Sequence, residues 1–354
     1  MVFDGSKNIR RPLMTDVAQH AGVSIASVDR VLNGRGGVRP AIAQRVLEAA
    51  AALRYVSEFE LQAMSGPRMM KIMFLLPEGT NQFLRMLGTL IRHSSAQAVS
   101  CSMRFQLETI KSFNPRLLAR AILSHGRQAD AVAFMALEHP VVREAVDELA
   151  ALSVPTVTLI SDVLNTKRLA YIGLDNRSAG RSAALLMSRF IGNRPAKVAL
   201  IAGSLAYRAH EDRELGFLQF CRELAPHIEV VGLCEGHDDE ALNFRQTRQL
   251  LSDHAGLAGI YNIGGGAQGV GRALKDTGLD QKIIVVGHGL TADTRSLLID
   301  GTMDAVITQS PRATLHACVD VFSNWREGRP PAQDVEMPRV EVILRENMPP
   351  VPFS

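Results

Sequence analysis

The sequence predicts a small all-α head of three short helices, followed by an α/β body built from two lobes with doubly wound parallel sheets. Residues 12–56 contain short helical patterns separated by a glycine turn. From residue 71 onward, continuous apolar strands alternate with helical patterns, which is typical of parallel sheets covered by helices on both faces. These strands fall into two series, and two series predict two similar lobes.

The composition is that of an ordinary globular protein with room for more than one domain, since the chain has 354 residues, of which 46% are hydrophobic and 21% charged. No apolar run approaches the roughly 18–20 residues that span a bilayer. Residues 1–11 show no secretory signal, and the four cysteines are far apart with no C-x-x-C pair. We therefore expect a cytoplasmic protein that needs no metal or cofactor and does not bind membranes.

The positive charge is concentrated at the N-terminal end. The whole chain has a formal net charge of +3, residues 1–71 carry +4 and the remainder carries −1. Such a distribution is expected when one domain alone binds a polyanion such as DNA.

The head follows the pattern of a helix-turn-helix module. Met14–His20 has apolar positions on one helical face, and Gly22 can adopt the left-handed conformation of a sharp turn. Ser24 can cap a second helix, Ile25–Asn33, and a third helix is expected to start near Pro40 and to end near Leu53. Helix, tight turn, helix and supporting helix together define the module.

The segments Asp16-Val-Ala-Gln-His-Ala-Gly-Val-Ser24 and Val28-Asp-Arg-Val-Leu-Asn33 resemble the DNA-binding head of the lactose-repressor (LacI) family. Tyr55-Val56 and the stretch to Gly66 resemble the hinge of that family. The resemblance implies a body of periplasmic-binding-protein type I architecture, operator DNA as a partner, and a homodimer or tetramer. A helical bundle that merely packs is the alternative. The expected domains are 12–56 (head), 57–70 (hinge) and 71–354 (effector-binding body), with lobe one at 71–170 and 310–333 and lobe two at 171–309 and 334–354.

The resemblance also implies which residues contact DNA. The second helix would enter the major groove, with base readers at its start and phosphate or positioning contacts around it. Met64 would insert into a central base step, or would simply pack against the body. The expected DNA-binding residues are Thr15, Ser24, Ile25, Ala26, Ser27, Asp29, Arg30, Asn33 and Met64.

Two of these positions predict an unusual operator. Ile25 and Ala26 are apolar, so they can touch a thymine methyl but cannot make the paired hydrogen bonds that identify guanine or adenine. Asp29 stands where the family usually has a small hydroxyl residue. Its carboxylate repels phosphate and accepts only from a donor such as the cytosine amino group.

Effector-binding residues are expected in the loops after the strands of the body, because ligands of open α/β sheets bind outside the carboxyl ends of the strands. The segment Arg213-Glu-Leu-Gly-Phe217 resembles the ligand-clamping arginine of the family; Arg208 is an alternative, as is a surface salt bridge of Arg213 with Glu211 or Glu214. Gly289 stands where an acidic residue is expected. The candidates are Asn81, Phe83, Asp162, Arg213, Asn262, His288 and Gln309.

One motif resembles a dinucleotide-binding site of an enzyme. Gly264-Gly-Gly-Ala-Gln-Gly269 fits the dinucleotide fingerprint G-x-G-x-x-G, which requires an acid at the end of the next strand to hold the ribose. That strand ends in Val286-Gly-His-Gly289 instead, so we interpret the glycines as a tight turn. The sequence shows no catalytic constellation, and we predict that the protein is not an enzyme.

Two function classes remain. The first is a DNA-binding transcriptional regulator, a repressor that a sugar or polyol effector releases from its operator. Within this class, the alternative is a corepressor-dependent repressor or an activator whose effector is a nucleoside or another polar metabolite. The second is a plain solute-binding protein, which would need an export signal and would have no use for residues 12–66. The helix-turn-helix head favours the regulator.

Overall fold

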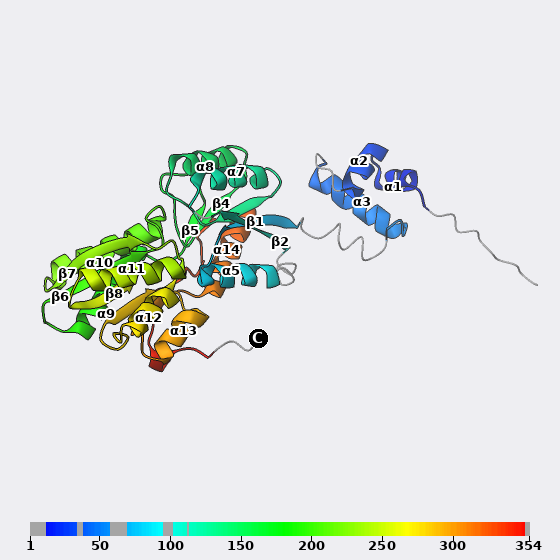
Figure 1. The fold of residues 1–354 in the computed structure, drawn as a ribbon. Coiled ribbons are helices and arrows are strands. Elements are labelled where there is room, and N and C mark those ends of the chain that lie inside the picture. Colours follow the sequence, from blue (N-terminus) through cyan, green and yellow to red (C-terminus); the bar gives the residue numbers. More distant parts are fainter. Residues whose placement is uncertain (1–11, 34–37, 57–68, 95–101, 112, 351–354) are drawn as a thin grey trace, which may run out of the picture. The chain divides into compact units, whose positions relative to one another are not determined.

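A computed structural model describes residues 12–33, 38–56, 69–94, 102–111 and 113–350. The chain divides into two compact units near Met69, which we call the head and the body and describe separately (Figure 1). The head is helical, and the body contains two largely parallel sheets with helices on both faces. The predicted fold class is therefore confirmed.

The head contains α1 (Met14–Ala21), α2 (Ile25–Leu32) and α3 (Pro40–Ala52). As predicted, Gly22 ends α1 in the left-handed conformation, with φ 63°. A side chain there would also collide with Arg45, because a Cβ atom would lie 2.9 Å from its guanidinium. Ser24 caps α2 by accepting a hydrogen bond from the Ser27 backbone N–H. The three helices enclose the apolar side chains of Val17, Ala18, Ala21, Val28, Val46, Ala49 and Ala50.

The first lobe of the body is built on a five-stranded parallel sheet in the order β2-β1-β3-β4-β5. Helices α7 and α8 cover one face, and α5 lies beside α14 on the other (Figure 1). The elements are β1 (Met70–Glu78), α5 (Gln82–His93), β2 (Met103–Lys111), α7 (Pro115–Gly126), β3 (Ala131–Phe134), α8 (Pro140–Ala151), β4 (Thr156–Leu159), β5 (Ala170–Ile172) and α14 (Pro311–Arg326).

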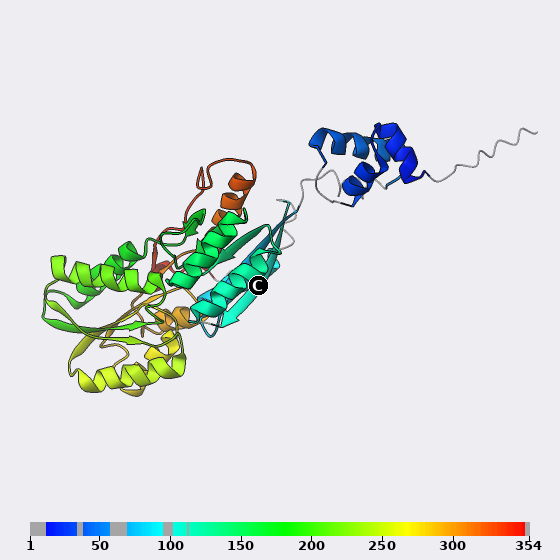
Figure 2. The ribbon, with the colours of Figure 1, turned by 90° about the horizontal axis from the view of Figure 1, so that it is seen from above.

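The second lobe is built on a six-stranded sheet in the order β11-β10-β9-β8-β6-β7, in which only β11 is antiparallel. Figure 2 shows this sheet between its two layers of helices. The elements are α9 (Asn176–Ile191), β6 (Ala196–Ala202), α10 (Arg208–Leu224), β7 (Ile228–Glu235), α11 (Glu240–Asp253), β8 (Leu257–Asn262), α12 (Ala267–Asp276), β9 (Ile284–His288), α13 (Ala292–Ile299), β10 (Ala305–Thr308), β11 (Glu341–Ile343) and the 3-10 turn η2 (Arg345–Asn347).

Strand β6 shows how this sheet separates two cores. Val198 and Leu200 pack into the core with α9 and α10, whereas Ala199 and Ile201 pack into the core with α12 and α13. Alternate side chains point to opposite faces of a strand, so a strand between two helix layers must be apolar at every position. This explains the continuous apolar runs in the sequence.

The two lobes repeat one topology. In each, the first strand of the lobe lies between the second strand at one edge and the third strand inside. The point where such a strand order reverses is where open α/β sheets bind ligands. The segment between β5 and α9 leads from the first lobe to the second, the segment between β10 and α14 leads back, and residues 327–340 lead again to the second.

No helix among the described residues is long and apolar enough to cross a membrane.

Helices α9 and α10 approach until their backbones touch. A Cβ atom on Gly180 would lie 2.0 Å from the Arg213 carbonyl oxygen, and a Cβ atom on Gly216 would lie 2.1 Å from the Arg177 carbonyl oxygen. Both distances are too short for any side chain, so glycine is required at each position.

We predict that Gly216→Ala destabilises the body by about 2 kcal/mol or more, because α10 must move away from α9. This sign is informative, since alanine ordinarily stabilises a helix interior relative to glycine. Unfolding in urea can be followed by the fluorescence of Trp325, the single tryptophan of the chain. Arg222→Ala, at an exposed position of α10, is the control and should change stability by less than about 0.5 kcal/mol. Equal stability of both variants would contradict the backbone contact.

Candidate functional site

A polar cavity lies between the two lobes of the body, beyond the carboxyl ends of the central strands. Its volume is about 810 Å³, including the part open to solvent. The first lobe lines it with the loop after β1 and with Met135 and Ile160, and the second lobe with the loops after β8, β9 and β10. This is the position that the reversal of strand order predicts for a ligand.

Five of the seven effector candidates line this cavity: Asn81, Phe83, Arg213, His288 and Gln309. Each follows or ends a strand except Arg213, which lies on α10. The other two candidates, Asp162 and Asn262, do not line it.

Asp162 and Asn262 hold loops in place. The Asp162 carboxylate accepts from the Thr158 hydroxyl at 2.6 Å and forms a bidentate ion pair with Arg168. This carboxylate raises the pKa of the Arg168 guanidinium. Asn262 is fully buried, and its amide donates to the carbonyls of Gly264 and Gly265, both at 3.2 Å. Asn262 therefore holds the glycine loop that lines the cavity, whereas Asp162 lines a separate cavity.

Arg213 is the cation at the floor of the cavity. Its Nε donates to Asn176 Oδ1 at 2.8 Å and its Nη1 to the Ile263 carbonyl oxygen at 3.0 Å. Burial lowers the pKa of this guanidinium. Within the described part of the chain it forms no ion pair, so the alternative of a surface salt bridge with Glu211 or Glu214 does not apply.

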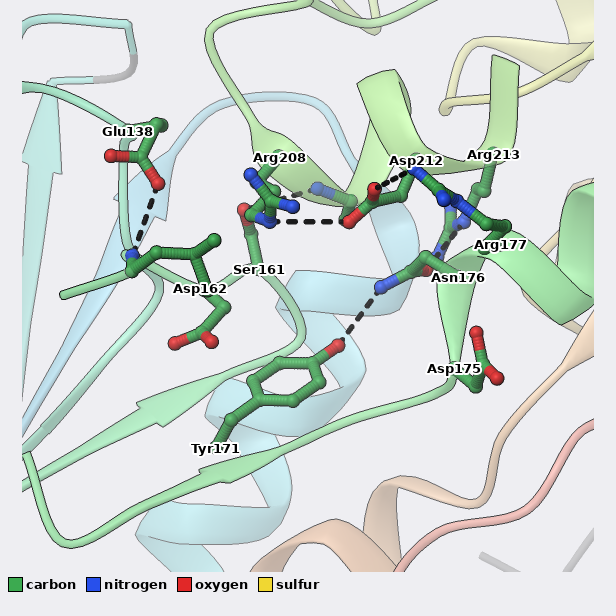
Figure 3. A network of polar contacts seen from close by, with 12 residues as sticks. Glu138, Ser161, Asp162, Tyr171, Asp175, Asn176, Arg177, Arg208, Asp212 and Arg213 are labelled. Atoms are coloured by element: carbon green, nitrogen blue, oxygen red, sulfur yellow. Dashed lines mark hydrogen bonds and ion pairs between the residues drawn. The ribbon is translucent and has the colours of Figure 1, made fainter. Parts of the chain in front are cut away.

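Arg208, the alternative to Arg213, faces elsewhere. Its Nε lies 3.3 Å from an Asp212 carboxylate oxygen, and both residues line a second cavity that also includes Tyr171 (Figure 3). Arg208 is absent from the lining of the main cavity.

Asn176 connects Arg213 to the segment that crosses between the lobes. Its Oδ1 accepts from Arg213, while its Nδ2 donates to the Tyr171 hydroxyl at 2.9 Å (Figure 3). The Tyr171 hydroxyl in turn donates toward the carbonyls of Ile160 and Leu174, at 2.9 and 3.0 Å. Burial raises the pKa of Tyr171, so the hydroxyl stays protonated. The chain that joins the lobes is thus hydrogen-bonded to the arginine of the cavity.

His210, which is buried, and His288, which is partly buried, face the cavity in their neutral form. Burial lowers the pKa of His210 to about 4, and its Nδ1 accepts from the Ser204 backbone N–H at 3.1 Å. Burial and the nearby Arg213 charge hold the pKa of His288 well below its usual range. His288 Nε2 lies 2.7 Å from the hydroxyl of Tyr261, whose ring stacks on Phe217.

Asp238 joins the two lobes at the cavity, and sequence reasoning missed it. Its carboxylate accepts from Asn81 Nδ2 of the first lobe at 2.9 Å and from the Gly265 backbone N–H at 2.6 Å. Its carbonyl oxygen accepts from the Thr80 hydroxyl at 2.7 Å. A further hydrogen bond between the lobes joins Gln82 to Asp293, another lining residue that the sequence did not reveal.

The glycines of the dinucleotide-like fingerprint serve close packing. A Cβ atom on Gly264 would lie 2.6 Å from both the Gly203 nitrogen and the Asp238 carboxylate, and one on Gly269 would lie 2.1 Å from the Glu240 carbonyl oxygen. Gly266 begins α12 in the left-handed conformation, with φ 71°. The tight turn expected from the sequence is present, and each glycine has a steric reason.

The candidate DNA-contact residues of the head lie along α1 and α2. Thr15, Ser24, Ala26, Arg30 and Asn33 are exposed, and Ile25 has an exposed fraction of 50%. Ser27 and Asp29 are partly buried. Asn33 Nδ2 donates to the Asp29 carboxylate at 2.8 Å, so this carboxylate is held along the helix. Met64 and residues 57–68 of the expected hinge lie outside the described residues.

The body, with two lobes of one topology closing on a polar cavity, defines the class of bilobal ligand-binding proteins. Residues 117–329 match the family described as "Periplasmic binding protein domain", and residues 13–58 match "Bacterial regulatory proteins, lacI family". The first match covers more than half of the chain. The chain therefore belongs to the periplasmic binding protein domain family and carries a lacI-family helix-turn-helix domain at its N-terminal end.

This chain is similar both to transcriptional regulators and to a sugar-binding protein. Catabolite control protein A of Priestia megaterium is 26% identical over 195 residues, which are 54% of each chain. The ribose operon repressor of Halalkalibacterium halodurans is 25% identical over 250 residues, 70% of each. The solved structure of GanP, a glucose-galactose binding protein from Geobacillus stearothermophilus, superposes with a TM-score of 0.71 at 21% identity, over 80% of this chain and all of that one. The match to the first of these relatives spans about half of its length.

The buried histidines predict a loss of stability in mild acid. The pKa of His210 is about 4 in the folded chain against 6.5 when solvated, so the unfolded chain binds more protons between these values and stability falls as the pH drops from 6.5 toward 4. We expect a loss of about 1 kcal/mol from His210 at pH 5.5, with His288 adding to it. Urea unfolding of the full chain at pH 7.5 and 5.5, followed by Trp325 fluorescence, measures the loss.

His210→Gln should reduce this dependence, because glutamine has no proton to gain. His93→Gln, at an exposed histidine of α5, is the control and should leave the dependence unchanged. A pH profile that is identical in both variants would contradict a neutral buried His210.

Proposed function

We propose that this protein is a sequence-specific DNA-binding transcriptional regulator, a repressor that a small sugar or polyol releases from its operator. The observation that carries the proposal is the presence, in one chain, of a lacI-family helix-turn-helix head and a body whose two lobes meet at a polar cavity. A DNA-binding domain and a ligand-binding domain in one chain make a regulator, and nothing in the cavity resembles a catalytic constellation.

The partners follow from the same observations. A helix-turn-helix head reads one half-site, so we propose that two copies pair and read a two-fold symmetric operator in the cytoplasm. The ribose operon repressor is a regulator by name, and GanP is by name a glucose-galactose binding protein. Both support a sugar-like effector in the cavity, which is lined by amide, guanidinium and carboxylate groups and by Phe83.

The structure offers a route by which an effector changes DNA binding. Both lobes contribute lining residues, and two side-chain pairs, Asn81–Asp238 and Gln82–Asp293, join the lobes across the cavity. A ligand that contacts all four side chains binds the closed and the open arrangements with different affinity. The affinity for operator then changes by the same factor as the affinity for ligand.

Selection of binding sequences from random DNA with the purified full chain, followed by fluorescence anisotropy with a sugar and polyol panel, tests the proposal. We expect one symmetric site, a steep decrease in affinity with salt, and release by one class of compound. A compound that tightens binding would instead identify a corepressor. Absence of any sequence preference would overturn the proposed function.

Arg213→Ala should abolish the response to the effector and leave operator affinity within about twofold. The variant loses charge-assisted hydrogen bonds to the ligand, which corresponds to a weakening of ligand affinity by about a hundredfold. Titration of the DNA complex with effector measures the response, and Trp325 fluorescence confirms folding. Arg208→Ala is the matched control on the same helix and should respond like the unaltered chain. A response that survives Arg213→Ala would exclude this arginine from the effector site.

Asp29→Asn should raise affinity for DNA of random sequence several-fold at low salt. The change removes a negative charge from the helix that enters the groove, while an amide can still bond to Asn33. The gain should shrink as salt concentration rises. Glu48→Gln on α3, which removes the carboxylate bonded to Gln44, controls for a general effect of charge on the head. Equal gains in both variants would argue against a groove position for Asp29.

A further inference from the structure

The charge of the main cavity is acidic. Its lining contains the carboxylates Asp238, Glu240 and Asp293 and the single cation Arg213. Among the described residues, none of these three carboxylates has a cationic side chain within ion-pair distance. Neutral groups hold two of them, since Asp238 accepts from Asn81 and Gly265 and Asp293 accepts from Gln82. Asp238 is buried, with an exposed fraction of 8%, whereas Asp293 is partly exposed and Glu240 exposed. A buried carboxylate that faces a cavity without a cation is stabilised by a ligand that brings one.

Gln309 gives an independent indication of a ligand. It lies at the end of β10, it lines the cavity, and its exposed fraction is 5%. Its side-chain oxygen is buried without a hydrogen-bond partner among the described residues. A buried acceptor without a partner is uncommon in folded proteins and calls for a donor. A ligand that carries N–H or O–H groups supplies one.

The histidines do not compensate the acidic charge. Both His210 and His288 are held neutral by burial, as described above. Neutral imidazoles contribute hydrogen-bonding nitrogens but no positive charge. Arg213 therefore remains the only positive charge in the described lining of the cavity.

One acidic residue of the cavity stands at a different position from the one that the family resemblance implies. Gly289, where the sequence leads one to expect an acid, is left-handed with φ 76°, and a Cβ atom there would lie 3.4 Å from the Phe83 side chain. The carboxylate lies instead in the first turn of α13, on Asp293, and faces Gln82 of the opposite lobe. Phe83, Gly289 and Asp293 all line the cavity.

We propose that the cavity selects a hydroxylated ligand that carries a protonated amine, such as an amino sugar or amino polyol. The ammonium group pairs with Asp238 and Asp293, and the hydroxyls bind Arg213 and the free oxygen of Gln309. An anionic analogue is rejected because three carboxylates repel it. This inference rests on the proposed role of the cavity as the effector site and specifies the class of effector.

Matched series of one sugar skeleton test the inference by calorimetry on the full chain at neutral pH. The probes are glucose, glucosamine, N-acetylglucosamine and glucuronate, with the corresponding galactose and mannose series. We expect the free amine of at least one series to bind about tenfold or more tightly than its neutral and acetylated members, and the acid to bind undetectably. Binding should weaken above a pH of about 8, as a sugar amine loses its proton.

Variants identify the carboxylates responsible. Asp293→Asn and Asp238→Asn should each reduce the preference for the amine over the neutral sugar to less than about threefold, because one charged partner of the ammonium is lost. Asp293 is partly exposed in the first turn of α13, so we expect its variant to remain folded and to keep the test valid even if Asp238→Asn loosens the lobes. Asp253→Asn, at an exposed position of α11, is the control and should keep the full preference.

The outcomes separate the inference from the proposed function. A neutral or acidic member that binds as tightly as the amine overturns the inference; if that member also releases operator DNA, the proposed function stands. Failure of every amine to bind overturns the inference as well, and operator binding by the same preparation shows that the regulator remains. Loss of sequence-specific DNA binding overturns the proposed function, whichever sugar binds.

Discussion

The buried guanidinium of Arg213 is the group on which the geometry of the body depends. A cation out of water needs acceptors, and Arg213 finds them in Asn176 and in the Ile263 carbonyl. Asn176 stands at the start of α9 and Arg213 on α10, so the bond forms only if these helices are close. Gly180 and Gly216 allow that approach, because each lies against backbone of the other helix. A pair of glycines thus positions the arginine, and the arginine ties the crossing segment to the cavity.

The groups that line the cavity also make contacts between the two lobes. The wall of the second lobe is fixed by Arg213, Asn262 and the glycine turn. The first lobe reaches it through Thr80, Asn81 and Gln82, at the start of α5. Asp238, in a left-handed conformation with φ 58°, presents both its carboxylate and its carbonyl to this segment. A ligand that engages Asp238 and Asp293 therefore touches the groups that hold the lobes together, and such contact is what an effector requires to shift a conformational equilibrium.

The sequence predicted the parts of the fold that are buried on both sides. Strands such as β6 and β8 are apolar at nearly every position because helices cover both faces, and that pattern is visible without a structure. Strand β2 is not visible as an apolar run, because it lies at an edge of its sheet and is exposed or only partly buried beyond its first four positions. The expectation that ligands bind at strand ends led to four candidates that line the cavity, Asn81, Phe83, His288 and Gln309, and the family resemblance led to the fifth, Arg213. Asp238 was not predicted because it follows β7, an edge strand of the second lobe whose positions are mostly partly exposed. Asp293 was not predicted because it lies on a helix, α13. Asp162 and Asn262 meet the strand-end expectation in sequence, yet their side chains are occupied by Arg168 and by the glycine turn. Proximity along the chain could not reveal those partners.

In the proposed complex with DNA, α2 of the head would read bases with few polar side chains. Ile25 projects half exposed at the start of α2, where it can touch a thymine methyl and little else. One turn further along α2, the Asp29 carboxylate accepts a hydrogen bond from the Asn33 side chain. This bond leaves fewer acceptor positions for a base and restricts rotation of the carboxylate toward phosphate. On this proposal, α2 would read few bases directly, and the positive charge of residues 1–71 would attract DNA without regard to its sequence. Discrimination in such a module must come from pairing two heads at a fixed spacing and from the deformability of the DNA between half-sites, because both add energy that depends on sequence without adding polar contacts to bases.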